Sequence, residues 1–303
     1  MCISDECKEG EITPEGIERR AFLTSATAAV VGIALASDIA GQQTTQPPSN
    51  ALTDPNVIQG MVSFKSGEFT IQGYQARPKA AGKYHAVLVL HGDFGVPEDH
   101  RFTAAQLAQN GFVSLAVKRF SRYPDLMQAD LIKSDKTDKH YLSRAFNEEE
   151  LQDAQAAINH LKSQPFVKRG RIGVVGFCGG GVQGLWLSTK SKDVKTVVAF
   201  YAPPIAPERF QLKSDPKPNL IDMVKQMKVP IQGHYGADDP FIPLDDVKKF
   251  EHALRLQHTP VEMFTYEGAG HAFSDYTRSN LYKPDAAALA KKRMLEFLKK
   301  NLK

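Results

Sequence analysis

Short, continuous apolar runs recur along the sequence from about residue 59 onward, with polar or helix-forming segments between them. Such runs are typical of strands that are covered on both faces. They are Ala86–Leu90, Val113–Val117, Ile172–Val175, Thr196–Phe200, Pro230–Tyr235 and Val261–Tyr266. An opening β-hairpin is expected over Val62 to Pro78, because Lys65-Ser66-Gly67-Glu68 separates two β-prone stretches.

Two segments between and after these runs have the apolar period of a helix. The first runs from Asn147 to Ser163, with a stripe formed by Leu151, Ala154, Ile158 and Leu161. The second runs from about Pro284 to Leu302, with Ala290, Met294, Phe297 and Leu298 facing inward and its lysines on a solvated face. Alternating strands and helices predict one α/β domain over residues 59–303, with a mostly parallel central sheet flanked by helices.

The N-terminal part has a different pattern. Arg19-Arg20-Ala21-Phe22-Leu23 precedes a weakly apolar run that ends in Ala34-Leu35-Ala36. This layout is typical of an export signal and resembles a bacterial twin-arginine signal. We therefore expect a signal at residues 1–36 and a flexible leader at residues 37–58. A periplasmic or secreted protein, with the twin-arginine translocase as partner during export, follows from this interpretation.

The apolar run is shorter than the ~20 residues that a spanning helix needs, so no stable membrane span is expected. The segment before the arginine pair is acidic, where a positive segment is usual. Two alternatives stay open on this ground: the true start lies further along, or the signal is kept as an anchor rather than cleaved after Ala36.

Composition narrows the class of protein. The 303 residues are 42% hydrophobic and 24% charged, which excludes a disordered chain. The formal net charge of +4 is small and scattered, so nucleic-acid binding is not expected. Three cysteines are too few for a disulfide scaffold, and Cys2 and Cys7 lie in the expected signal. Cys178 would then be the one thiol of the exported protein.

Cys178 lies in Gly176-Phe177-Cys178-Gly179-Gly180, directly after a predicted strand and before helix-forming sequence. Gly-x-nucleophile-x-Gly at this place is typical of the nucleophile elbow of α/β-hydrolases, with the N–H of Gly179 aimed at the oxyanion. Two other interpretations are a buried core cysteine and a phosphate-binding turn. The second is disfavoured because Gly-x-Gly-x-x-Gly is absent and no Lys-Ser/Thr follows.

A base and an acid follow two later strands. Asp238 and Asp239 come shortly after the run ending at Tyr235, and His271 comes shortly after the run ending at Tyr266. The chain order nucleophile–acid–histidine is that of the α/β-hydrolase fold. Because parallel strands end at one edge of the sheet, we expect Cys178, an aspartate and His271 to meet there.

These motifs resemble those of the dienelactone hydrolase family, a cysteine-using branch of the α/β-hydrolases. The matching stretches are Gly176-Phe177-Cys178-x-Gly180-Gly181, Gly236-x-x-Asp239-x-Phe241-x-Pro243 and Gly270-His271-Ala272-Phe273. The resemblance selects Asp239 over Asp238 as the acid. It implies cleavage of lactones or esters through an acyl-cysteine, without a metal or an organic cofactor. It also implies a second oxyanion donor, the main-chain N–H of Asp93.

The sequence departs from the family pattern at two positions. Gly92 stands where the family often has a glutamate that holds the resting thiol, and Asp275 stands where an arginine for an anionic substrate is expected. Arg122 falls where a second substrate-binding arginine is expected, and Tyr123 and Phe177 are further candidate contacts. A neutral lactone or small ester therefore fits at least as well as an anionic dienelactone.

The predicted function is a cysteine-dependent hydrolase of small esters or lactones. Two alternatives keep the fold and change the function. One is a thiol-reactive protein that traps its ligand. The other is a non-catalytic ligand-binding member, suggested by the missing glutamate at Gly92.

Overall fold

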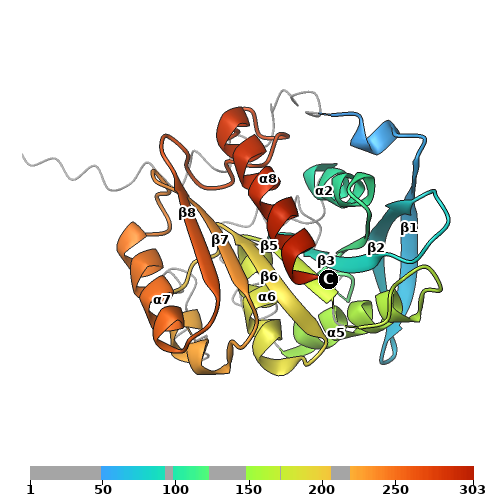
Figure 1. The fold of residues 1–303 in the computed structure, drawn as a ribbon, viewed down its shortest axis with the longest axis horizontal. Helices are drawn as coiled ribbons and strands as arrows, with labels where there is room; N and C mark the ends of the chain where they lie inside the picture. The colour runs from blue at the N-terminus through green and yellow to red at the C-terminus, as the bar shows by residue number, and fades with distance from the viewer. Residues whose placement is uncertain (1–48, 93–97, 123–147, 171, 206–218) are drawn as a thin grey trace, which may run out of the picture. The chain divides into compact units, whose positions relative to one another are not determined.

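The apolar runs of the sequence form the strands of one eight-stranded sheet in the described part of the chain (Figure 1). The computed structural model describes residues 49–92, 98–122, 148–170, 172–205 and 219–303. The strand order is β1-β2-β4-β3-β5-β6-β7-β8. Strands β3 to β8 pair in parallel, while β2 pairs antiparallel with both β1 and β4. The predicted α/β fold with a mostly parallel sheet is confirmed.

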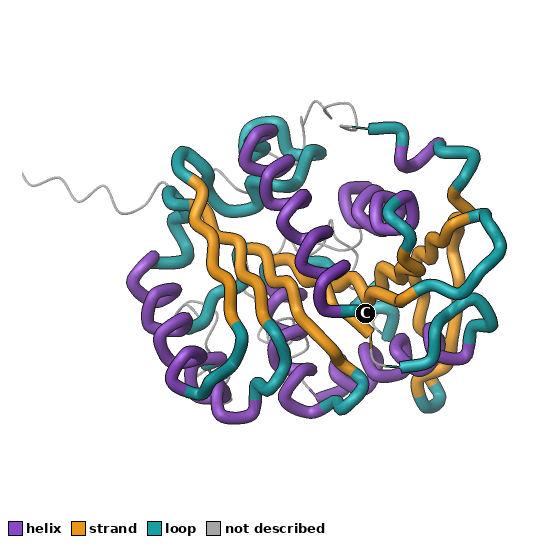
Figure 2. Tube along the Cα trace, viewed as in Figure 1, coloured by secondary structure: helices purple, strands orange, loops and turns teal. Residues whose placement is uncertain are grey.

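The element bounds agree with the apolar pattern to within a few residues. The strands are β1 (Val57–Ser66), β2 (Phe69–Pro78), β3 (His85–Leu90), β4 (Phe112–Val117), β5 (Ile172–Phe177), β6 (Val194–Phe200), β7 (Ile231–Gly236) and β8 (Val261–Tyr266). The helices are η1 (Ala51–Thr53), α2 (Glu98–Gln109), α5 (Glu148–Ser163), α6 (Gly179–Lys190), η3 (Leu220–Gln226), α7 (Leu244–Leu256) and α8 (Pro284–Asn301). Figure 2 shows the strands between two layers of helices.

The opening hairpin forms where the turn residues predict it. Ser66 pairs with Phe69, and Gly67 takes the left-handed backbone conformation with a φ of 59°. Glycine adopts this conformation without the steric cost that other residues carry. The hairpin extends the parallel sheet on the β4 side, because β2 pairs antiparallel with β4.

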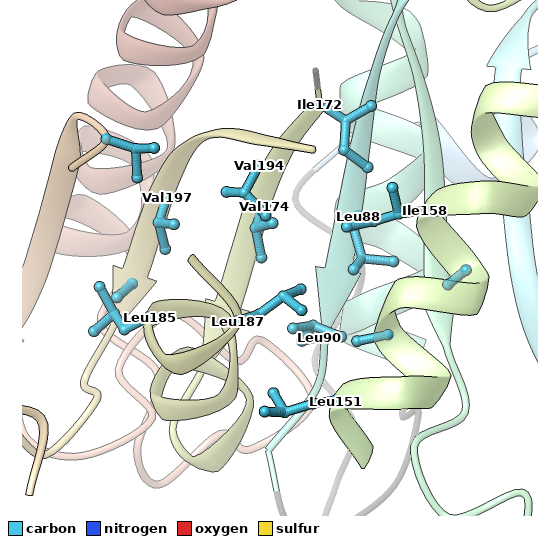
Figure 3. Close-up of a cluster of buried hydrophobic side chains, with 14 of the residues drawn as sticks. Leu88, Leu90, Leu151, Ile158, Ile172, Val174, Leu185, Leu187, Val194 and Val197 are labelled. Atoms are coloured by element: carbon cyan, nitrogen blue, oxygen red, sulfur yellow. The ribbon is translucent and has the colours of Figure 1, made fainter. Parts of the chain in front are cut away.

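Alternate residues of the buried strands face two separate cores. On β3, Leu88 and Leu90 belong to the core under α5 and α6, whereas Val87 and Val89 belong to the core under α2 and α8. The first core includes Leu151 and Ile158 of α5 with Leu185 and Leu187 of α6 (Figure 3). Helices on both faces explain why these strands are continuously apolar.

Helix α8 buries the predicted stripe of Ala290, Met294, Phe297 and Leu298. The prediction that all its lysines are solvated is wrong for Lys291, which is 8% exposed. Its Nζ lies 4.8 Å from the centre of the Phe102 ring on α2. The apolar stem of a lysine can be buried in this way, and here the neighbouring charges of Asp99 and Asp275 favour the ammonium form.

The first described residues belong to the fold, although they lie within the range 37–58 expected as a leader. Ala51 of η1 is completely buried, and β1 begins at Val57. Gln59 donates from Nε2 to the carbonyl oxygens of Ala51 and Leu52. The signal that the sequence predicts at residues 1–36 lies outside the described residues. Within those that are described, no helix has the length and apolarity required to cross a membrane.

Candidate active site

Cys178 lies on a sharp turn between β5 and α6. Its φ is 51° and its ψ is −122°, an unusual conformation for a residue with a side chain. The Cys178 N–H donates to the carbonyl of Phe200 at 2.9 Å, and the Cys178 carbonyl accepts from the N–H of Gly181 at 2.9 Å. These bonds tie the turn to β6 on one side and to the first turn of α6 on the other.

The glycines around Cys178 are required by close backbone approach. A Cβ at Gly180 would lie 2.2 Å from the carbonyl oxygen of Leu90 and 2.3 Å from that of His91. A Cβ at Gly176 would lie 2.3 Å from the carbonyl oxygen of Gly180. The turn therefore packs against the end of β3, which brings the segment after β3 beside the nucleophile.

The structure brings the three predicted catalytic side chains together. His271, after β8, bonds through Nδ1 to Oδ2 of Asp239 at 2.8 Å, and Cys178 lies close enough to its imidazole to raise the pKa of that ring. Oδ1 of Asp239 accepts the main-chain N–H of Phe241 at 2.8 Å. The Asp239 side chain is fully buried, so both its oxygens are held in place. The arrangement is that of a nucleophile, a base and an orienting acid.

The charge state of His271 follows from its neighbours. Burial by itself would lower the pKa of His271, but its interactions with Cys178 and with the Asp239 carboxylate outweigh this effect and raise it to about 10. The imidazole therefore holds a proton at neutral pH. A thiolate–imidazolium pair is the activated form of a nucleophilic cysteine.

Two aromatic rings pack against the imidazole of His271. The Tyr201 ring lies 5.0 Å from the His271 ring, and the Phe241 ring lies 5.2 Å away at 70°. Tyr201 follows β6 with a φ of 38°, and its hydroxyl is hydrogen-bonded to Ser274 at 3.1 Å. We did not predict a role for Tyr201, although its place directly after an apolar run is a usable signal.

The structure describes one of the two expected oxyanion donors, Gly179, but not the other, Asp93. Gly179 is the first residue of α6, so its N–H belongs to the positive end of that helix. Asp93 lies outside the described residues. Gly92 borders the nucleophile, because a Cβ at Gly92 would lie 3.3 Å from Cβ of Cys178. The position where the family resemblance implies a glutamate therefore faces the thiol.

No contact with the thiol of Cys178 is found for the two described residues among the expected substrate contacts, Arg122 and Phe177. Arg122 bonds through Nε and Nη2 to both oxygens of Asp153 on α5, each at 2.7 Å, and lies over the Phe69 ring. Phe177 is 2% exposed and stacks on Phe200 within the core. Tyr123 lies outside the described residues.

The carboxylate of Asp275, which would repel an anionic substrate, has two partners of its own. Its Oδ2 pairs with Nε of Arg278 at 3.2 Å, and its Oδ1 accepts the main-chain N–H of Thr277 at 3.0 Å. Asp275 is 5% exposed, so this carboxylate is part of the turn after His271.

A buried group next to the site was missed in the sequence. Arg119, two residues after β4, forms an ion pair with Glu150 of α5 at 2.8 Å and also contacts His91. Within the residues that the structure describes, no three His, Cys, Asp or Glu side chains are grouped so that they could hold a metal ion.

Comparison with known proteins identifies the family. The model of the dienelactone hydrolase family matches residues 71–302. The chain belongs to this family. Membership places the chain among lactone and ester hydrolases with an α/β-hydrolase fold.

Individual members are similar over most of their length. The "Putative carboxymethylenebutenolidase" of Escherichia coli K12 is 30% identical over 90% of this chain and 97% of its own. A Bradyrhizobium protein named "Probable 2-oxo-3-(5-oxofuran-2-ylidene)propanoate lactonase" is 31% identical over 76% of this chain and 89% of its own. A crystal structure titled as a dienelactone hydrolase from Klebsiella pneumoniae superposes with a TM-score of 0.71 at 27% identity, covering 80% of this chain and 98% of its own.

Proposed function

We propose that this member of the dienelactone hydrolase family is a cysteine-dependent hydrolase of small, neutral esters or lactones. The observation that carries the proposal is the hydrogen bond of His271 to Asp239 beside Cys178, which lies on the turn between β5 and α6 and raises the pKa of His271. A thiolate at the positive end of a helix, beside a histidine that an acid orients, is equipped for acyl transfer.

In the first half-reaction the thiolate attacks the carbonyl carbon of the substrate. A C–S bond forms, and the carbonyl oxygen takes the electron pair of the broken π bond, stabilised by the main-chain N–H groups of Gly179 and Asp93. The C–O bond to the leaving group then breaks as the carbonyl re-forms. His271 gives its proton to the departing alkoxide, which leaves a thioester on Cys178 and a neutral imidazole.

In the second half-reaction water replaces the alcohol. Neutral His271 takes a proton from water, and the hydroxide adds to the thioester carbon. When the C–S bond breaks, the product carboxylic acid leaves and the thiolate returns next to a protonated His271. Asp239 keeps Nδ1 of His271 oriented in both halves, and does not itself transfer a proton.

The charges near the site favour a neutral substrate. The guanidinium of Arg122 is paired with Asp153, and that of Arg278 with Asp275. A substrate carboxylate would have to compete with a carboxylate already in place on either arginine. This pairing supports a lactone or ester without a free carboxylate. Phe177 is buried in the core and Arg122 is bound to Asp153, so neither supports the expected substrate contacts, and Tyr123 lies outside the described residues.

A panel of aryl acetates, simple lactones and their anionic analogues tests the proposal. Wild type should turn over the neutral members, and Cys178→Ala should lose about 10⁴-fold or more of this activity with an unchanged melting temperature. Cys178→Ser serves as the matched control, since it keeps an atom of similar size with a weaker nucleophile. Wild-type-like turnover by Cys178→Ala, or a clear preference for anionic lactones, would contradict the proposal.

Two other candidate functions keep the fold: a thiol-reactive protein that traps a ligand, and a non-catalytic binding protein, which Gly92 beside Cβ of Cys178 favours. The thiol-reactive protein is tested by burst kinetics. It predicts one equivalent of product in a burst and no further turnover. A non-catalytic binding protein would show neither the burst nor rapid alkylation of Cys178 by iodoacetamide at neutral pH.

We further propose that the protein is exported by the twin-arginine route, on the strength of Arg19-Arg20-Ala21-Phe22-Leu23 and the apolar run after it. Replacing both arginines by lysine should keep the protein in the cytoplasmic fraction of a bacterial host. Equal export of the variant and wild type would contradict this route.

A further inference from the structure

The bond between the orienting acid and the histidine joins two turns that follow neighbouring strands. The acid turn is residues 237–243 after β7, and the histidine turn is residues 267–271 after β8. Strands β7 and β8 pair in parallel up to Gly236 and Tyr266, the last residue of each. Beyond these residues, the separation of the two turns decides whether the acid reaches the imidazole.

Both side chains are held in place by neighbours other than each other. Oδ1 of Asp239 accepts the main-chain N–H of Phe241 at 2.8 Å, and the Asp239 side chain is fully buried. The imidazole of His271 packs against the rings of Tyr201 and Phe241, at 5.0 and 5.2 Å between ring centres. The 2.8 Å distance from Oδ2 of Asp239 to Nδ1 of His271 therefore depends on how closely the two turns approach.

Main-chain hydrogen bonds dock the two turns on each other. The N–H of Ala237 donates to the carbonyl oxygen of Tyr266 at 2.9 Å. The N–H of Asp238 donates to the carbonyl oxygen of Ala269, also at 2.9 Å. Asp238, which the family resemblance rejects as the acid, thus takes part through its main chain, while its side chain is exposed. The acid turn and the histidine turn form one hydrogen-bonded unit.

This docking requires a residue without a side chain at Gly236. A Cβ there would lie 2.3 Å from the carbonyl oxygen of Ala269 and 2.7 Å from that of Gly270, which directly precedes His271. Non-bonded carbon and oxygen atoms do not approach so closely. Both oxygens belong to the main chain, so no side-chain rotation relieves the overlap. The histidine turn would have to move away from the acid turn.

We propose that Gly236 is a positioning residue: its lack of a side chain lets the histidine turn dock on the acid turn, and so sets the distance between Asp239 and His271. The inference rests on the proposed function, in which Asp239 keeps Nδ1 of His271 oriented through both half-reactions. It predicts that a methyl group at residue 236 acts on the base, although this residue touches neither the base nor the nucleophile.

Gly236→Ala tests this role through two measurements. In steady-state hydrolysis of a simple lactone, kcat/KM should fall about 10²-fold, because the base is misplaced. In NMR spectra of the isotope-labelled full chain, pH titration of the His271 ring, assigned by its loss in His271→Gln, should give a pKa lower than in wild type by about one unit or more. Burial lowers the pKa of His271, and the hydrogen bond and charge of Asp239 are among the effects that raise it, so loss of that bond must lower it.

The matched control is Gly233→Ala on the same strand. A Cβ at Gly233 would also lie 2.3 Å from another atom, but that atom is the sulfur of Met263, and the next is a ring carbon of Tyr235 at 2.8 Å. Both belong to side chains, and methionine adapts readily to a changed neighbour. Gly233→Ala should lower the melting temperature through overpacking, yet leave kcat/KM and the pKa of His271 close to wild type.

Amide hydrogen exchange of wild type tests the docking without any substitution. The N–H of Asp238 should exchange slowly, as that of Ala237 does, although the Asp238 side chain is exposed. Both N–H groups are bonded across the two turns, and such bonds slow exchange. An unprotected Asp238 amide would overturn the inference even if Gly236→Ala does not fold.

Folded Gly236→Ala with the kcat/KM and the His271 pKa of wild type would also overturn the inference. Equal losses in Gly236→Ala and Gly233→Ala would do the same, because that result means a general loss of packing. An absence of hydrolysis by wild type is a distinct result, which overturns the proposed function. The titration and the hydrogen exchange need no turnover, so they still decide whether Gly236 sets the bond between Asp239 and His271.

Discussion

Three features of the fold bear on the chemistry of Cys178. Its own backbone conformation forms the sharp turn, α6 presents its positive end from the next residue onward, and His271, far along the chain, offers a proton site. The chemistry of Cys178 therefore depends on its place in the fold. A free cysteine in the same chain would be a weak nucleophile at neutral pH, since its ordinary pKa is about 8.5.

The pKa of His271 leads to a prediction for alkylation. A histidine whose pKa is raised from 6.5 to about 10 keeps its proton across the neutral range and loses it only as the pH rises past that value. The paired thiolate should therefore react with iodoacetamide at a nearly constant rate from about pH 7 to 9. In His271→Gln the rate should be lower at pH 7 and should rise with pH, as for an ordinary thiol. A wild-type rate that climbs steadily between pH 7 and 9 would contradict the ion pair.

At Gly92 the chain lacks the glutamate side chain that the family resemblance implies. The resemblance implies a glutamate at this position that holds the resting thiol, and the structure places the position against Cβ of Cys178. In this chain no glutamate side chain at this position can compete with His271 for the thiol of Cys178.

The interface between α2 and α8 carries charges that an apolar pattern does not reveal. Asp99 of α2 is fully buried, and Lys291 of α8 lies near it with its Nζ also buried. Burial raises the pKa of Asp99 to about 7, and the charge of Lys291 opposes this rise. A carboxyl group with a raised folded-state pKa destabilises the fold increasingly as the pH rises from about 4 to 7.

Asp99→Asn should therefore be more stable than wild type above pH 7, by a few degrees in melting temperature, and about equal to it near pH 4. The reason is that asparagine removes a group that must either bind a proton or be buried with its charge. Thermal unfolding monitored by circular dichroism at both pH values measures the difference. A variant that is less stable than wild type at pH 8 would show that the Asp99–Lys291 attraction outweighs desolvation.

The elements that the sequence predicts well are those with a clear apolar period. The six apolar runs, the opening hairpin and helices α5 and α8 follow directly from side-chain pattern. Helix α2 was not delimited, because it buries Asp99, His100 and Thr103 on the face where the pattern calls for apolar residues. The buried polar residues of α2 lie near Lys291 of α8, which is some two hundred residues further along the chain, so a local pattern does not explain them.

The residues at and near the site also differ in how well the sequence predicts them. Cys178, Asp239 and His271 each sit in a local motif after a strand, so the motifs identify them. Arg119 and His91 carry no such motif. They meet because β3 and β4 are neighbours in the sheet, and that order is a property of the folded chain.

Residues 41–303 form one compact unit, whose described part starts before the expected boundary at residue 59. A chain that begins at Gly41 should therefore melt at the same temperature as the full chain. A chain that begins at Gln59 loses the buried Ala51, both carbonyl partners of Gln59 and the first residues of β1. It should melt several degrees lower, by about 2–4 °C for each kcal/mol lost. Equal melting temperatures for both would show that residues 41–58 are a leader after all.

The molecule as a whole gathers its chemistry at one edge of the sheet. Strands β5, β7 and β8 run parallel, so their carboxyl ends carry Cys178, Asp239 and His271 to the same place (Figure 1). The antiparallel hairpin β1–β2 widens the sheet without interrupting this edge. The fold thus places Cys178, Asp239 and His271 at this edge, and Gly92 lies beside Cys178 there.

The covalent intermediate is the central claim, and intact-protein mass spectrometry tests it most directly. Wild type mixed rapidly with an aryl acetate and quenched in acid should gain the mass of one acetyl group, and peptide mapping should place that group on Cys178. The signal should decay as substrate is exhausted, and Cys178→Ala should not acquire it. Sustained hydrolysis with no acetyl group on Cys178, or with the group on another residue, would contradict the account.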